Sequence, residues 1–169
     1  AVLSLNDIVT STSVRIAGNV FDQDIIKYIR DKYKLLIGDR TAEDIKINFA
    51  SCYKADKKQT MEVKGRNLIT GLPHMITITQ EETEEALNES VRKIVKAATN
   101  VLEQTPPELS ADIVNKGLVL TGGGAMLKGL TDLLTKELDV PVLIAESPLT
   151  CVVEGTGVLL EKPSELEEE

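Results

Sequence analysis

An apolar strand that ends in three consecutive glycines constrains this chain more than any other feature. Residues 117–120 have the composition of a buried strand, residues 121–124 form a glycine turn, and apolar residues at helical spacing follow over 125–138. A further extended run over 140–145 completes a strand–helix–strand unit, whose two strands are expected to be parallel with a right-handed crossover. The sequence therefore predicts an α/β core built on this unit.

The glycine turn is also a candidate ligand site, formed by Gly122, Gly123, Gly124, Ala125 and Met126. Glycine lets the backbone turn sharply and lets a ligand approach where a Cβ would stand. Amides in the first turn of a helix attract anions and polar atoms. A tight turn without a ligand would explain one glycine, but three in a row favour a ligand. The pattern matches neither the P-loop nor the dinucleotide-binding fingerprint.

Glu43 and Lys46 form a second candidate site. They are three residues apart in a helix predicted over 41–49, so they share one face of it. A carboxylate beside an ammonium can accept from and donate to the hydroxyls of a ribose and the edge of a base. A solvated ion pair has the same spacing, and spacing alone favours that simpler interpretation.

The other segments predict alternating small elements and one long helix. Thr79 and Glu82 have the spacing of a capping box, and the helix that they open would span ~37 Å at 1.5 Å per residue. Asp22 is expected to N-cap an amphipathic helix that continues to Leu36. The remaining expected elements are a hairpin of 1–5 and 8–16 turning at Asn6 and Asp7, strands at 59–67 and 74–79, helices at 80–104, 108–114 and 148–161, and an acidic tail at 163–169.

Composition excludes several classes of function. Acidic residues outnumber basic ones by 27 to 19, giving a formal charge of −8, whereas a nucleic-acid partner requires a basic surface. No apolar run approaches the roughly 20 residues of a membrane-spanning helix. Cys52 and Cys151 have no metal-like spacing and are expected to be reduced thiols. His74 is expected to be solvated. No Ser/His/Asp set and no metal cluster is evident, so neither catalytic nor metal-ligating residues are assigned.

Several segments together resemble the bacterial actin homologues of the rod-shape-determining MreB/Mbl family, in order and at family spacing. The resemblance extends from Ala1 to about Lys162. The segments are Val-Arg-Ile-Ala-Gly at 14–18, Leu-Ile-Gly-Asp-Arg-Thr-Ala-Glu at 36–43, Gly-Leu-Pro at 71–73, Thr-Pro-Pro-Glu-Leu at 105–109, Leu-Thr-Gly-Gly-Gly at 120–124 and Pro-Leu-Thr-Cys at 148–151. The glycine turn alone is shared with actins, chaperones and sugar kinases, so the combination carries the resemblance.

The resemblance implies the second half of an actin-like, ribonuclease H-like ATPase, with a mixed sheet flanked by helices and a small inserted α+β lobe. Residues 1–18 and 83–147 would form its core, 19–82 the inserted lobe, and 148–162 a helix returning to the first half. Glu43 and Lys46 would hold the ribose and adenine edge of ATP or ADP. The glycine turn would back the adenosine and approach the α-phosphate, and this segment would not ligate Mg²⁺ directly.

The family's phosphate hairpin Asp-x-Gly-Gly-Gly-Thr, its catalytic acid and its membrane-inserting segment would all lie before Ala1. The 169-residue chain alone is therefore expected not to hydrolyse ATP. The whole protein would polymerise with ATP at the cytoplasmic face of the cell membrane, maintain rod shape and organise cell-wall synthesis. Its implied partners are other subunits, a RodZ-like membrane protein and the cell-wall elongation machinery. Two alternatives remain: half of another actin-fold ATPase, such as a sugar kinase or chaperone, or a module that only binds other proteins.

Overall fold

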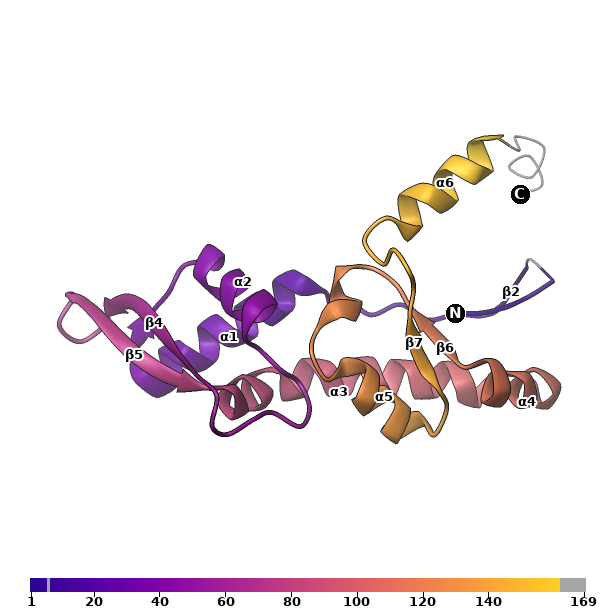
Figure 1. The fold of residues 1–169 in the computed structure, drawn as a ribbon. Coiled ribbons are helices and arrows are strands. Elements are labelled where there is room, and N and C mark those ends of the chain that lie inside the picture. Colours follow the sequence, from indigo (N-terminus) through magenta and orange to yellow (C-terminus); the bar gives the residue numbers. More distant parts are fainter. Residues whose placement is uncertain (6, 162–169) are drawn as a thin grey trace.

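A 24-residue helix, α3 (Gln80–Glu103), runs through the middle of the molecule, and the strand hairpin of residues 60–79 extends beyond its N-terminal end (Figure 1). The computed structural model describes residues 1–5 and 7–161. The capping box that opens α3 is confirmed. The Thr79 hydroxyl accepts from the Glu82 amide at 3.3 Å, and the Glu82 carboxylate accepts from the Thr79 amide at 2.7 Å. Leu87 and Val91 on the inner face are almost fully buried, so this helix is the spine of the fold.

A lobe of two helices and three strands packs at the N-terminal end of α3. Its elements are α1 (Gly18–Tyr33), β3 (Leu35–Leu36), α2 (Asp39–Asn48), β4 (Thr60–Asn67) and β5 (Pro73–Thr79). The strands form an antiparallel sheet in the order β3-β4-β5. Both predicted extended runs and the second predicted helix are confirmed within a few residues.

The predicted position of Asp22 is wrong. The N-cap is Ala17, five residues earlier, and helix α1 begins at Gly18, so Asp22 lies inside the helix and is buried. The helix also ends earlier than expected, at Tyr33, because Lys34 adopts a left-handed conformation with φ 52°. Leu36 is consequently a strand residue.

The strand–helix–strand unit lies beside the C-terminal half of α3. Helix α4 (Pro107–Lys116) leads into β6 (Leu118–Leu120), and β7 (Val142–Ile144) pairs with β6 in parallel, as predicted. The single helix predicted over 125–138 is wrong. A 3₁₀ turn, η1 (Gly123–Met126), is followed by an interruption and then by α5 (Leu130–Leu138). Gly129 causes the interruption, because its φ of +87° is incompatible with a continuous right-handed helix.

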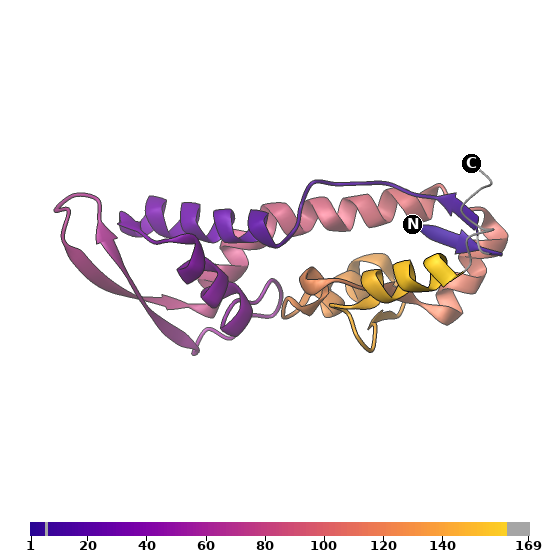
Figure 2. The ribbon, with the colours of Figure 1, turned by 90° about the horizontal axis from the view of Figure 1, so that it is seen from above.

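A hairpin, β1 (Val2–Ser4) and β2 (Asp7–Thr10), starts the chain and then leads along α3 into α1 (Figure 2). The hairpin was predicted, but its second strand ends at Thr10 rather than Ile16. Asp7 is already paired with Ser4, so it belongs to the strand and not to the turn. Leu5 adopts the left-handed conformation instead, and Asn6 lies outside the described residues.

Helix α6 (Cys151–Glu161) projects away from the rest of the molecule (Figure 1). Most of its side chains are exposed, including the apolar Val152, Val153 and Leu160. Residues 162–169, with the predicted acidic tail, lie outside the described part of the chain. None of the described helices is long and apolar enough to cross a membrane.

One hydrophobic cluster joins the two ends of the fold. Phe21, Ile25 and Ile29 of α1 belong to it, and so do Leu130 and Leu134 of α5. Aliphatic side chains supply most of the cluster, as a chain with 3% aromatic residues requires. Because the same core anchors both candidate binding segments, their relative position is set by packing as well as by hydrogen bonds.

Candidate functional site

Gly122 begins the glycine turn where β6 ends. Its backbone has φ 82° and ψ 166°, a combination that only glycine adopts without strain. Its amide donates to the carbonyl of Pro148 at 2.6 Å, which joins the turn to the segment before α6. Glycine at position 122 is therefore required by the backbone itself, whether or not a ligand binds.

Gly123 and Gly124 differ from Gly122, because the fold does not require them. Neither has a positive φ. A Cβ on Gly124 would meet nothing within 4 Å, and one on Gly123 would reach only Leu149 Cδ2 at 3.4 Å, an ordinary contact. Side chains here would project into open space beside the turn. The missing Cβ atoms thus fit a flat ligand such as a nucleoside lying against the backbone.

The next two residues of the turn face opposite ways. Ala125 is buried, with only 4% of its surface exposed, so its side chain packs behind the turn. Met126 is 58% exposed. The continuous helix predicted over 125–138 would have turned Met126 towards the core, but the 3₁₀ turn leaves it exposed instead. Of the two, Met126 has the side chain that a ligand could touch.

Lys46 makes its main contact with a residue from another helix. Its ammonium lies 2.8 Å and 2.9 Å from the two carboxylate oxygens of Asp22 on α1, and 3.3 Å from the carbonyl of Gly18. Glu43, one turn earlier on α2, is exposed. Among the described residues Lys46 is paired with Asp22 and not with Glu43, so the solvated Glu43–Lys46 pair is not formed in this structure.

A backbone junction connects the two candidate segments. Ser51, just after α2, forms a parallel bridge with Lys128, just after the glycine turn, and the Cys52 amide donates to the Lys128 carbonyl at 2.9 Å. Gly129 allows this approach, because a Cβ there would lie 2.7 Å from the Tyr53 carbonyl oxygen. Lys46 is five residues from one side of the junction and Met126 two residues from the other.

Buried polar groups from α3 complete the junction. The Thr83 hydroxyl accepts from the Ser51 amide at 3.1 Å and donates to the Gln80 carbonyl at 2.7 Å. The Gln80 amide group donates to the Phe49 carbonyl at 2.8 Å. Buried polar groups that are satisfied in this way favour one geometry. No hydrogen bond or ion pair within the described residues joins Glu43 or Lys46 directly to the turn.

A groove of about 780 Å³ lies elsewhere, between α3, α5 and residues 52–57. None of the seven predicted site residues lines it. Cys52 lies at one wall, and burial raises the pKa of its thiol to about 12, so the reactive thiolate is disfavoured. Cys52 and Cys151 are both free thiols. No metal-binding group of three or more His, Cys, Asp or Glu side chains occurs in the described part of the chain.

Three residues with clear structural importance were missed from the sequence. Asp22 was assigned to a helix cap, and Ser51 and Gly129 were given no role. Each has a partner far away along the chain. Asp22 and Lys46 are 24 positions apart, Ser51 and Lys128 are 77 apart, and Gly129 and Tyr53 are 76 apart. Local patterns carry no signal over such separations. The one available hint was a glycine within an otherwise helical pattern, which often marks a break or a close approach.

Comparison with solved structures defines the class of protein. The structure of MreB5 of Spiroplasma citri bound to ADP matches with a TM-score of 0.89 and 38% sequence identity, over 98% of this chain and 51% of that chain. The complex of the same protein with AMPPNP matches with a TM-score of 0.88. A MamK double helical filament, at 20% identity and a TM-score of 0.70, shares the fold. The predicted fold class is confirmed: this is an actin-like α/β structure.

The sequence comparisons identify the family. The family model described as MreB/Mbl protein matches residues 1–168, and the chain therefore belongs to the MreB/Mbl family. The cell shape-determining protein Mbl of Bacillus subtilis is 54% identical over 166 residues. The cell shape-determining protein MreB of Escherichia coli K12 is 51% identical over 161 residues. These matches cover 98% and 95% of this chain but 50% and 46% of the relatives, so the chain spans about half their length.

Proposed function

We propose that this chain is the second half of an ATP-dependent, actin-like filament protein that maintains rod cell shape by organising cell-wall synthesis. Membership of the MreB/Mbl family carries the general role, since the curated relatives are cell shape-determining proteins. The half-length match supports the idea that the chain works as one of two halves around a nucleotide.

In this proposal the chain supplies the adenosine-binding wall of the cleft. The supporting observation is the pair Gly123 and Gly124, whose missing Cβ atoms leave open space that the fold itself does not need. The turn would back the adenosine, with Met126 touching it, while Glu43 and Lys46 would hold the ribose and adenine edge. Structures of MreB5 with ADP and AMPPNP provide the precedent for such a ligand.

The proposed division of labour follows the elements. Residues 1–18 and 83–147 form the core of this half, 19–82 form the inserted lobe, and 148–162 return to the first half. The exposed apolar side chains of α6 support the last assignment, because they have no cover among the described residues. Phosphate binding, Mg²⁺ and the catalytic acid would belong to the first half, so the 169-residue chain alone would not turn over ATP.

The remaining parts of the proposal concern partners and place. The whole protein would assemble with other subunits at the cytoplasmic face of the cell membrane. It would contact a RodZ-like membrane protein and the cell-wall elongation machinery. The excess of acidic residues, 27 against 19 basic ones, supports protein rather than nucleic-acid partners.

The test is nucleotide-dependent assembly of the full gene product. Light scattering and electron microscopy should show filaments with ATP and far fewer without nucleotide. The 169-residue chain alone should bind adenine nucleotides at best in the millimolar range, worth about 4 kcal/mol. Micromolar ATP affinity or turnover by that chain would contradict the half-cleft arrangement. Assembly that ignores nucleotide would contradict the ATP-dependent role.

A further inference from the structure

Asp22 occupies an unusual position for a carboxylate. It lies inside α1, and only 8% of its surface is exposed to solvent. Both of its oxygens lie within 2.9 Å of one group, the ammonium of Lys46 on α2. Buried ion pairs stabilise a fold weakly, because desolvation of the two charges offsets most of their attraction. A buried pair that joins two helices at a candidate binding site therefore invites a functional explanation.

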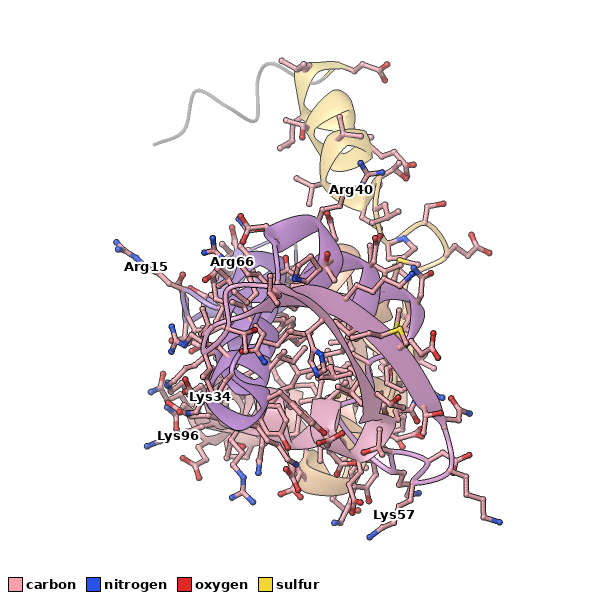
Figure 3. The ribbon with its side chains drawn as sticks, turned by 90° about the vertical axis from the view of Figure 1, so that its left-hand side faces the viewer. Arg15, Lys34, Arg40, Lys57, Arg66 and Lys96 are labelled. Atoms are coloured by element: carbon pink, nitrogen blue, oxygen red, sulfur yellow. The ribbon has the colours of Figure 1, made fainter. Side chains whose placement is uncertain are left out.

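The pairing fixes the direction of the Lys46 ammonium. The group is held by Asp22 on one side and by the Gly18 carbonyl at 3.3 Å, and a Cβ on Gly18 would lie only 3.2 Å from it. The Lys46 side chain is 16% exposed to solvent, so a ligand can still reach it. The Arg15 side chain, by contrast, is exposed and points outward into solvent (Figure 3).

The pairing also neutralises the charge of Lys46. A lone, half-buried ammonium would attract a phosphate, whereas an ammonium already matched by a carboxylate offers little to a second anion. The pair still suits hydroxyl groups. Asp22 itself is buried, but an ammonium has three donors. One donor goes to the Asp22 carboxylate and one to the Gly18 carbonyl, so the neutral pair keeps a donor for a ligand hydroxyl. A ribose, which is uncharged and carries two neighbouring hydroxyls, matches that combination.

We propose that Asp22 is a positioning and specificity-determining residue, which holds and neutralises Lys46 so that this end of the site takes the ribose rather than the phosphates. This inference rests on the proposed nucleotide site and adds to it the role of Asp22. The ribose lies at the Asp22–Lys46 pair, and the phosphates extend away from it.

The experiment compares ATP with 2′-deoxyATP and 3′-deoxyATP, and with inorganic tripolyphosphate, by calorimetric titration of the full gene product. The unaltered protein should prefer ATP over at least one deoxynucleotide by about tenfold, the order of one hydrogen bond to a charged group. Asp22→Asn should reduce that preference to within about twofold and should strengthen tripolyphosphate binding. The matched control is Asp24→Asn, also on α1, whose carboxylate accepts from the Ser90 hydroxyl at 2.5 Å. It should leave the preference unchanged.

Each result decides between the explanations. If Asp22→Asn lowers stability but keeps the preference for ATP, Asp22 is a purely structural brace and the inference is wrong. If the unaltered protein binds ATP without preferring it to either deoxynucleotide, the inference is also wrong, while the proposed function stands. If the unaltered protein binds no adenine nucleotide, both fail together.

A second variant guards against misfolding of the first. Asp22→Asn leaves the Lys46 ammonium half-buried without its counter-charge, which can prevent folding. The double variant Asp22→Asn/Lys46→Met has no charge in that position and nearly the same volume. It should fold and should show the same loss of preference for ATP over the deoxynucleotides. A double variant that retains the preference would overturn the inference.

Discussion

The backbone of Ser51 is bridged in parallel to that of Lys128, 77 residues further along the chain. The Ser51 hydroxyl reinforces the bridge, since it lies 3.3 Å from the Lys128 carbonyl oxygen, and Thr83 of α3 accepts from the Ser51 amide. Three segments that are distant in sequence thus meet at one buried point. Because α2 precedes this junction and the glycine turn precedes Lys128, the junction sets the distance between the two candidate binding segments.

Gly129→Ala should destabilise the fold at this junction. The residue has φ +87°, and its new Cβ would lie 2.7 Å from the Tyr53 carbonyl oxygen. A left-handed conformation costs a non-glycine residue about 1–2 kcal/mol, and the contact with a backbone oxygen adds to that. Urea unfolding of the 169-residue chain should show a lower free energy of unfolding.

The matched control for that experiment is Gly155→Ala in α6. A Cβ there meets nothing within 4 Å, and alanine is favoured over glycine in a helix by about 1 kcal/mol. This variant should unfold at the same or a slightly higher urea concentration than the unaltered chain. Equal stability of the Gly129 and Gly155 variants would show that the junction is loose.

Gly123→Val should abolish ATP-dependent assembly of the full gene product without unfolding it. The branched side chain would occupy the open space beside the turn, where the adenosine is proposed to lie. Circular dichroism should show an unchanged fold, and light scattering with ATP should show no filaments. Normal nucleotide affinity in this variant would mean that the glycines serve only the turn.

Glu43→Ala should have a milder effect than Gly123→Val. Glu43 is an exposed side chain, so its removal leaves no buried group unsatisfied and takes away one ligand contact. The loss of one hydrogen-bonded group typically costs about 1–3 kcal/mol. Titration of the full gene product should therefore show weaker ATP binding with assembly restored at higher ATP concentration. An unchanged affinity would remove Glu43 from the site.

The parts of the fold that depend on local patterns were predictable. The capping box, the length of α3 and the parallel β6–β7 pair follow from residues within a few positions of one another or from the handedness of one crossover. The family resemblance, carried by six short segments, predicted the actin-like class. Each of these features can be recognised from short contiguous segments of the sequence.

The parts that depend on distant contacts were not predictable. Aspartate is a common N-cap residue, so the sequence indicated a helix cap at Asp22. Only the packing of α1 against α2 reveals Lys46 as its partner. Gly129 lies in an apolar helical pattern, and only the approach of Tyr53 explains the break there. The candidate site, too, was predictable only in the part that depends on a local pattern. Its glycine turn was visible in the sequence, whereas the groups that orient it and Lys46 were not.

Acid should destabilise the fold in part through Glu82. Burial alone would raise the pKa of this carboxyl, but hydrogen bonds from Lys32, Tyr33 and the Thr79 amide together lower its pKa below the ordinary 4.5. A group whose pKa is lowered by folding contributes stability above its unfolded pKa, and this contribution is lost as pH falls through the folded value. The free energy of unfolding should therefore decrease below about pH 4.5, with the decrease extending through the lower folded pKa.

The matched pair for this measurement is Glu82→Gln and Glu89→Gln. Glu89 lies on the same helix and is also paired with a lysine, Lys93, but its side chain is 78% exposed. Urea titrations at several pH values should show a shallower acid dependence for Glu82→Gln and almost no change for Glu89→Gln, because solvent screens exposed pairs. A Glu82→Gln profile parallel to that of the unaltered chain would contradict the role of Glu82.

The free edge of β1 should promote self-association of the 169-residue chain. Among the described strands β1 pairs only with β2. Its neighbourhood exposes apolar side chains, with Leu3 68% and Leu5 95% exposed. An apolar edge with unpaired backbone groups is a template for another strand, and a charge on that edge opposes such pairing. Leu3→Lys should therefore shift sedimentation-velocity profiles towards the monomer at unchanged stability. Ile69→Lys is the control, since Ile69 is 80% exposed at the β4–β5 turn. An equal shift in both variants would attribute the association to general apolar exposure rather than to the strand edge.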